Sequence, residues 1–66
     1  MLNAGELIKY CRKFRGMSQL KLEEQSGVYA ANICRYELGQ IEPKFSTLQY
    51  CLEAMGFELV LKEKKR

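Results

Sequence analysis

The sequence predicts a mainly α-helical fold, in which four helices are followed by a single β-strand. A chain of 66 residues has room for one domain, so we expect residues 1–66 to form one unit. Through most of the chain, apolar residues recur at the three- and four-residue spacing of amphipathic helices, and glycines interrupt this spacing. From residue 57 the apolar residues alternate instead, which is typical of a strand.

The first helix is expected over about residues 4–15. Asn3 followed by Glu6 is the pattern of a capping box, in which two side chains satisfy the free N–H groups at a helix start. Gly16 is a suitable end. One face of this helix is apolar and comprises Ala4, Leu7, Ile8, Cys11 and Phe14.

Two short helices joined by a glycine turn are expected next. The first covers about residues 18–25 and begins at Ser18, a good N-cap residue. Gly27 suits a left-handed turn. The second covers about residues 29–38 and ends at Gly39. A pair of short helices with a tight turn between them is the arrangement called helix-turn-helix.

The fourth helix is expected over about residues 46–55, with Ser46 and Gln49 as its capping box. The strand follows at about residues 57–62, and its apolar face comprises Phe57, Leu59 and Leu61. A lone strand leaves its backbone groups unpaired and is not stable alone. A second copy of the chain is the simplest partner, and the alternative is a tail that packs on its own subunit.

Composition excludes several classes of function. The chain has no His and no Asp, and no Ser or Cys has a convincing base beside it, so we expect no enzyme activity. The cysteines are three and scattered, which argues against a metal site, and we expect no cofactor. Apolar runs are too short to span a membrane and the start lacks a signal-peptide pattern, so we expect a cytoplasmic protein. The net charge of +3 suits an anionic partner.

Two stretches, "LIKYCRKFRGMSQLKLEEQSGV" and "NICRYELGQIEP", make residues 5–57 resemble the phage repressor and Cro type of helix-turn-helix domain, the XRE-like family. The resemblance implies a lambda-repressor-like four-helix fold. It also implies a homodimeric transcriptional regulator that binds double-stranded DNA sequence-specifically, either a repressor or an antitoxin-like autoregulator. The helix over residues 29–38 would then enter the major groove.

The resemblance also implies roles for individual residues. Gln19 matches a phosphate contact at a helix start, and Arg35 matches a contact to bases or flanking phosphates. Arg12 and Glu37 match a structural ion pair. The full set of DNA-binding positions is Gln19, Tyr29, Ala30, Ala31, Asn32, Arg35, Gln40 and Lys44.

The sequence departs from the family pattern in the helix pair. Glu23 stands where a small residue is usual, so we expect it to turn outward or to find a cationic partner; Ser26 stands where an apolar residue is usual. The outer arc of the helix over residues 29–38 is mostly apolar and includes Ala31, Cys34 and Leu38. This arc supports an alternative function, a protein–protein interaction module on the same fold.

The end of the chain, "GFELVLKEK", is similar to the C-terminal strand of the HipB-like antitoxins within this family. The similarity implies a homodimer in which Phe57, Leu59 and Leu61 lie on paired strands. A separate toxin or regulatory protein would be a further partner. The operator, the regulated genes and the direction of regulation do not follow from the sequence.

Overall fold

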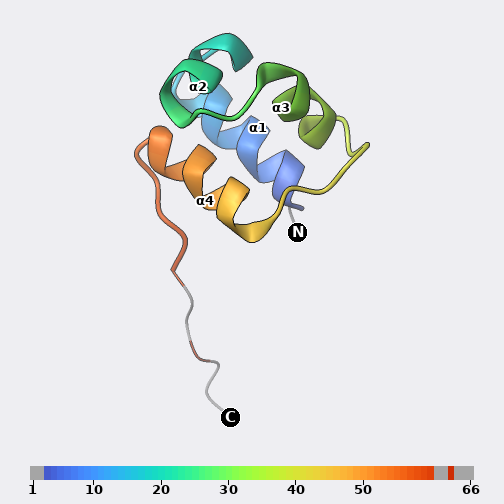
Figure 1. The fold of residues 1–66 in the computed structure, drawn as a ribbon. Coiled ribbons are helices and arrows are strands. Elements are labelled where there is room, and N and C mark those ends of the chain that lie inside the picture. Colours follow the sequence, from blue (N-terminus) through green and yellow to red (C-terminus); the bar gives the residue numbers. More distant parts are fainter. Residues whose placement is uncertain (1–2, 61–62, 64–66) are drawn as a thin grey trace.

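The computed structural model describes residues 3–60 and residue 63. Figure 1 shows helices packed against one another, and a tail that leaves the end of the last helix. The helices are α1 (Ala4–Phe14), α2 (Gln19–Ser26), α3 (Ala30–Glu37) and α4 (Phe45–Ala54). The predicted four-helix organisation is confirmed, and each helix end lies within one residue of its expected place. None of these helices is long and apolar enough to cross a membrane.

The helix starts follow the predicted caps in two cases and not in a third. Asn3 Oδ1 accepts a hydrogen bond from the Glu6 N–H at 2.8 Å, and the Glu6 side chain completes the capping box of α1. The Ser18 side chain accepts a hydrogen bond from the Lys21 N–H at 3.0 Å and so caps α2. The predicted capping box of Ser46 and Gln49 is wrong, because α4 begins one residue earlier than expected and Ser46 lies inside its first turn.

The core is formed by apolar side chains from all four helices. It comprises Ile8, Cys11, Leu22, Ile33, Cys51, Leu52 and Met55. α2 and α3 contribute one of these residues each, Leu22 and Ile33, so most of the surface of the two helices stays outside the core. Burial raises the pKa of the Cys51 thiol to about 11, which keeps this thiol protonated and unreactive near neutral pH.

Gly5 sets the distance between α1 and α3. A Cβ atom at this position would collide with the carbonyl group of Tyr36 in α3. Gly5 therefore lets the two helices approach more closely than any larger residue would allow. The sequence analysis did not single out this position, because the approach joins residues far apart in the chain.

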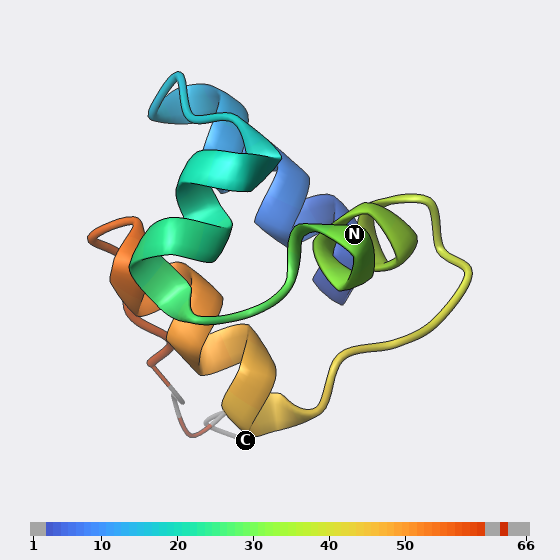
Figure 2. The same cartoon turned by 45° about the horizontal axis from the view of Figure 1, so that its top comes forward.

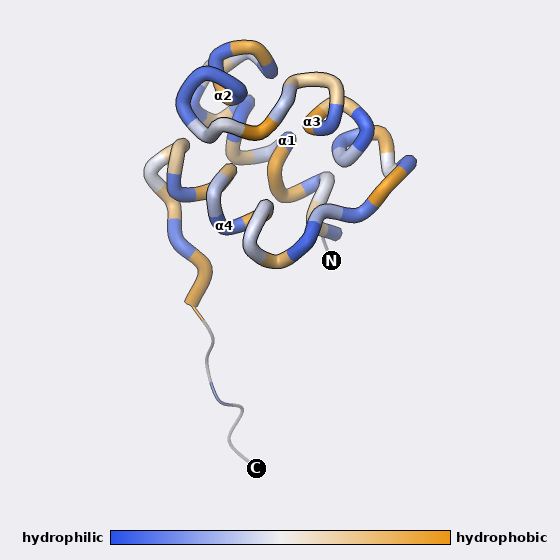
Figure 3. Tube along the Cα trace, in the orientation of Figure 1, coloured by the Kyte–Doolittle hydropathy of each residue, from blue (hydrophilic) through white to orange (hydrophobic). Residues whose placement is uncertain are grey.

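The tail after α4 has no regular secondary structure over residues 57–60. A strand was expected over about residues 57–62, and residues 3–60 provide no neighbouring strand to complete its hydrogen bonds. Phe57 packs against the core, whereas Leu59 and Val60 are exposed. Leu61, the third residue of the predicted apolar face, lies outside the described residues. Figure 3 shows a hydrophobic stretch of the tail just before the trace first turns grey.

Candidate nucleic-acid interface

The turn between α2 and α3 is tight and is closed by polar contacts. Gly27 ends α2 in the left-handed conformation, with φ at 79°, and donates its N–H to the carbonyl of Glu23. The Val28 N–H donates to Ser26 Oγ at 3.1 Å, while the Val28 side chain packs against the core. Ser26 therefore has a defined role in the turn, although its type departs from the family pattern. Figure 2 shows the short connection that joins the two helices.

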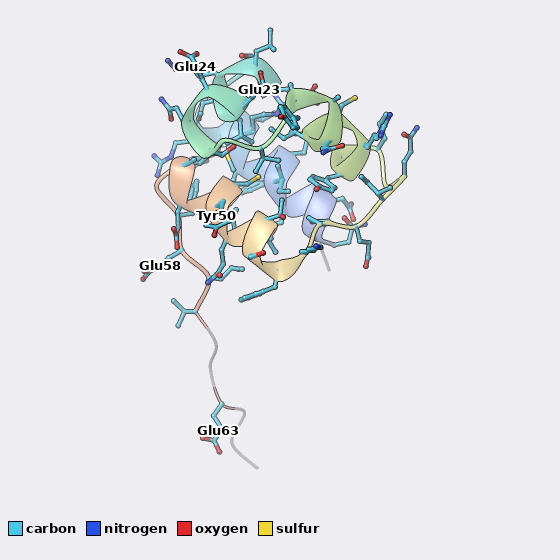
Figure 4. The ribbon with its side chains drawn as sticks, viewed as in Figure 1. Glu23, Glu24, Tyr50, Glu58 and Glu63 are labelled. Atoms are coloured by element: carbon cyan, nitrogen blue, oxygen red, sulfur yellow. The ribbon has the colours of Figure 1, made fainter. Side chains whose placement is uncertain are left out.

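Glu23 caps the start of α3 from the neighbouring helix. Its Oε2 accepts a hydrogen bond from the Ala30 N–H at 2.9 Å, whereas Tyr29, the N-cap residue, makes no side-chain cap. The expectation that Glu23 would turn outward or meet a cationic side chain is wrong. Its carboxylate meets the positive end of the α3 dipole, which has the same electrostatic effect as a cation. Figure 4 shows Glu23 beside the connection to α3.

Arg12 and Glu37 form the ion pair that the resemblance implied. Arg12 Nε lies 2.8 Å from Glu37 Oε2, and a second nitrogen of the same guanidinium donates to Glu37 Oε1 at 2.9 Å. The third nitrogen donates to the Met17 carbonyl at 2.8 Å. The side chains are 13% and 5% exposed, respectively. This bidentate pair fixes the end of α3 to α1 and to the connection before α2.

The charge of Glu37 is maintained despite its burial. Burial works to raise the pKa of Glu37, but hydrogen bonds from Arg12 and Gln19 work in the opposite direction. The positive charges of Arg12 and Lys9 add to these hydrogen bonds, and the pKa of Glu37 is lowered from its ordinary value. The ion pair is therefore present at neutral pH.

Gln19 is tied into the same group of side chains. Its Nε2 donates to Glu37 Oε1 at 3.2 Å. An amide nitrogen carries two hydrogens, so one remains for a second acceptor at the start of α2. The structure thus gives Gln19 a positioning role that the sequence analysis, which treated it as a phosphate contact, did not include.

The outer face of α3 carries small and polar residues. Ala31 and Arg35 are exposed, while Ala30 and Asn32 are half-buried. Tyr29, at the start of the helix, is 71% exposed. The structure brings these predicted positions together on one short helix, and a helix of this kind with small side chains can approach a partner closely.

The loop after α3 continues the same region of the chain. Gly39 turns the backbone with φ at 76°, and the Gln40 N–H donates to the Arg35 carbonyl at 2.9 Å. Gln40 and Lys44 are both exposed, as is the acidic residue Glu42 between them. The loop therefore offers one cationic and one amide side chain beside α3, and its charge is not uniformly positive.

Comparisons with models of protein families, with curated proteins and with solved structures found no match for this chain. The structural features that indicate a function are the α2–α3 pair, the polar contacts that orient it, and the exposed face of α3.

Proposed function

We propose that this chain is a homodimeric transcriptional regulator of the XRE-like type, which binds double-stranded DNA with α3 in the major groove. One observation carries the proposal: α3 buries only Ile33 and exposes Ala31 and Arg35 on its outer face. The major groove is about 12 Å wide and accepts a helix whose outer side chains are small. The regulator would act in the cytoplasm as a repressor or as an antitoxin-like autoregulator.

Side chains on α3 would contact bases, and side chains in the following loop would contact phosphates. Arg35 is the residue best suited to read a base, because a guanidinium can donate two hydrogen bonds to guanine. Ala31 would contact the methyl group of thymine, which needs no hydrogen bond. Gln40 and Lys44, exposed in the following loop, would meet phosphates.

Glu23 limits one kind of DNA contact. Its carboxylate already accepts a hydrogen bond from the first N–H of α3. A phosphate at the same N-terminus would meet this negative charge at close range. The proposal therefore places phosphate contacts at α2 and the loop, and base contacts on the outer face of α3.

The homodimer would place two copies of α3 on one side of the DNA, about one helical turn apart. The tail over residues 57–62 would pair with the same tail of a second copy, because its alternating pattern needs a neighbouring strand. Phe57, Leu59 and Leu61 would share one face of that sheet. A separate toxin or regulatory protein would be a further partner.

Selection of bound sequences from random duplex DNA at about 0.15 M salt tests this function. The proposal predicts enrichment of a palindromic site, since a two-fold dimer reads two equivalent half-sites. An enriched site without palindromy would keep DNA binding but reject the dimer. Recovery of no preferred sequence, together with no retardation of duplex DNA, would reject the function.

A protein–protein interaction module is the second candidate. Large apolar residues are exposed on or beside the helix pair: Leu20 at 69%, Tyr29 at 71% and Leu38 at 66%. Such exposure is common at protein interfaces. This function predicts that Leu38→Glu abolishes capture of a partner protein and that the chain does not retard DNA at physiological salt.

A further inference from the structure

An exposed aromatic surface lies along the outer side of α1. The rings of Tyr10 and Phe14 are stacked with centres 6.4 Å apart, and Phe57 meets Phe14 edge to face at 5.9 Å. Tyr10 and Phe14 are 60% and 64% exposed. Contact between side chains four residues apart stabilises a helix only slightly, so it does not account for two large rings in solvent. Residues 3–60 therefore leave this aromatic surface uncovered.

Arg15, at the end of α1, holds the rings in place. Its Nε donates a hydrogen bond to the Met55 carbonyl at 2.8 Å. Its guanidinium lies 5.4 Å from the centre of the Phe14 ring and 4.5 Å from that of Phe57, where a cation is attracted to the face of a ring. The rings are thus positioned before a ligand arrives, which lowers the entropic cost of binding one. Arg15 is exposed, so its charge stays accessible at this end of the surface.

Positive side chains run beside the rings. An α-helix turns by about 100° per residue, so Lys9 and Lys13 form a row next to the row of Tyr10 and Phe14. Both lysines are exposed. Each of these two turns of α1 therefore presents one aromatic ring and one ammonium group. We give the name α1 platform to the three rings and the three cations, which are Tyr10, Phe14, Phe57, Lys9, Lys13 and Arg15.

The α1 platform faces away from α3. Gly5 marks the side of α1 toward α3, since it lies against the Tyr36 carbonyl. Arg12 marks the same side, since it pairs with Glu37. At about 100° per residue, Tyr10 lies about 150° round the helix from that side. A ligand on the platform would therefore leave the outer face of α3 free.

We propose that the α1 platform binds single-stranded DNA, whose unpaired bases stack on its rings and whose phosphates meet its cations. Proteins bind single strands by this combination of aromatic side chains and positive charge. In a duplex the faces of the bases are stacked on one another, so the rings have no access to them. The inference does not rest on the proposed function of α3.

Two carboxylates limit the extent of the platform. Glu6 is exposed one turn before Tyr10, where a further ring would continue the row, and Glu58 is exposed next to Phe57. Both repel phosphates. The platform therefore takes about two nucleotides, one for each turn that carries a ring and an ammonium group. Every base has a face that can stack, so binding is independent of sequence.

Fluorescence anisotropy with two labelled oligomers tests whether the bases are bound. A short oligothymidine should bind the full chain about tenfold more tightly than an abasic oligomer of the same length, which has the phosphates but no rings to stack. The logarithm of the association constant should fall with the logarithm of the salt concentration with a slope of about −2, as expected for three cations. Equal binding of the two oligomers, or binding of neither, would overturn the proposal.

Substitutions on α1 test the rings and the cations separately. Tyr10→Ser should weaken binding of oligothymidine about tenfold, while Tyr50→Ser, on α4 and 59% exposed, should leave it unchanged. Figure 4 shows Tyr50 on α4. Lys13→Gln should weaken binding of both oligomers alike and flatten the salt slope. Circular dichroism should show unchanged helix content, since these side chains are exposed. Wild-type affinity in Tyr10→Ser would overturn the proposal.

Nuclear magnetic resonance of the wild-type chain locates the site without any substitution. Oligothymidine should shift the amide signals of residues 9–15 and leave those of α3 unchanged. Shifts confined to α3 would overturn the proposal. Rings and cations recognise bases and phosphates but not a ribose hydroxyl, so oligouridine RNA should bind no more tightly than oligothymidine. RNA bound more than about tenfold more tightly would overturn the assignment to DNA.

The outcomes separate this inference from the proposed function. Lys44→Gln, in the loop after α3, should weaken binding of a selected duplex and leave binding of oligothymidine unchanged. Lys13→Gln should have the opposite pattern. A chain that binds oligothymidine through Tyr10 but binds no duplex would keep the inference and reject the proposed function. A chain that binds the duplex through α3 but does not bind oligothymidine would reject the inference and keep the proposed function.

Discussion

The α2–α3 pair and the C-terminal tail differ in where their backbone groups find partners. In the helix pair, the groups at the turn and at the start of α3 are satisfied within the chain, by Ser26 and by Glu23. In the tail, residues 57–60 form no ladder, although their sequence has the pattern of a strand. The comparison teaches that a helical segment can be completed by its own chain, whereas a single strand needs a second one.

The helix pair should be sensitive to any change that leaves a buried polar group without its partner. Arg12→Ala would leave the Glu37 carboxylate, which is 5% exposed, without its two strongest hydrogen bonds. We expect the free energy of unfolding to fall by about 3 kcal/mol, measured by urea denaturation. Lys21→Ala removes an exposed ion pair with Glu24, whose charged atoms lie 3.9 Å apart. This control should change the free energy of unfolding by less than about 0.5 kcal/mol. Equal effects would contradict the assigned role of Arg12.

A smaller effect should follow at the start of α3. Glu23→Ala removes the acceptor for the Ala30 N–H and should lower the free energy of unfolding by about 1 kcal/mol. Glu23→Gln keeps an acceptor oxygen and should cost less than the alanine variant. Glu24→Ala, at the neighbouring exposed position, is the matched control. A Glu23→Ala protein as stable as this control would show that α3 does not need the cap.

The pH dependence of stability tests whether Glu37 is ionised in its pair with Arg12. Because the folded-state pKa of Glu37 is lowered, its stabilising contribution is complete above the unfolded pKa of about 4.3 and is lost as the pH falls through the folded value. Wild type should therefore lose stability more steeply than Glu37→Gln below about pH 4.3. Chemical denaturation at a series of pH values measures this difference. If the stability of wild type and of Glu37→Gln fell equally with decreasing pH, Glu37 would not be stabilised as an ionised partner of Arg12.

Truncation of the tail should have the smallest effect on the stability of the helices, but it should abolish dimer formation. Removal of the residues after Glu58 keeps Phe57, which packs against the core. We expect the thermal midpoint of the diluted, monomeric protein to be unchanged, and the dimer at high protein concentration to be lost. Calorimetry and sedimentation measure the two quantities. A truncated chain that still forms the wild-type dimer would mean that the helices, and not the tail, carry the interface.

Much of the helical structure could be predicted because its determinants are local. Capping residues and glycine breaks set the start of α1 and the end of α2 in the sequence itself. The prediction that Ser46 caps α4 was wrong, because α4 begins at Phe45 and its N-cap residue, Lys44, makes no side-chain cap. The pairing of Arg12 with Glu37 came from a family resemblance and could not come from spacing, because the two residues are far apart in the chain.

The parts of the site that sequence reasoning missed involve contacts between elements. Glu23 reaches the Ala30 N–H only because α2 and α3 cross at the turn. A signal did exist, since Tyr29 is a poor capping residue and α3 therefore needed an acceptor from elsewhere. No local pattern indicated that position 5 must be glycine, because the residue that excludes a side chain there is Tyr36, whose carbonyl lies in another helix.

The most direct test of the proposed function is binding of a fluorescent duplex that carries the selected site, measured by anisotropy with wild type and Arg35→Ala. Arg35 is exposed on α3 and would read a base. The account predicts that Arg35→Ala weakens binding to this site by about 1–3 kcal/mol and leaves binding to an unrelated duplex nearly unchanged. Equal loss on both duplexes, or no loss on either, would contradict the assignment of α3 as the helix that reads DNA.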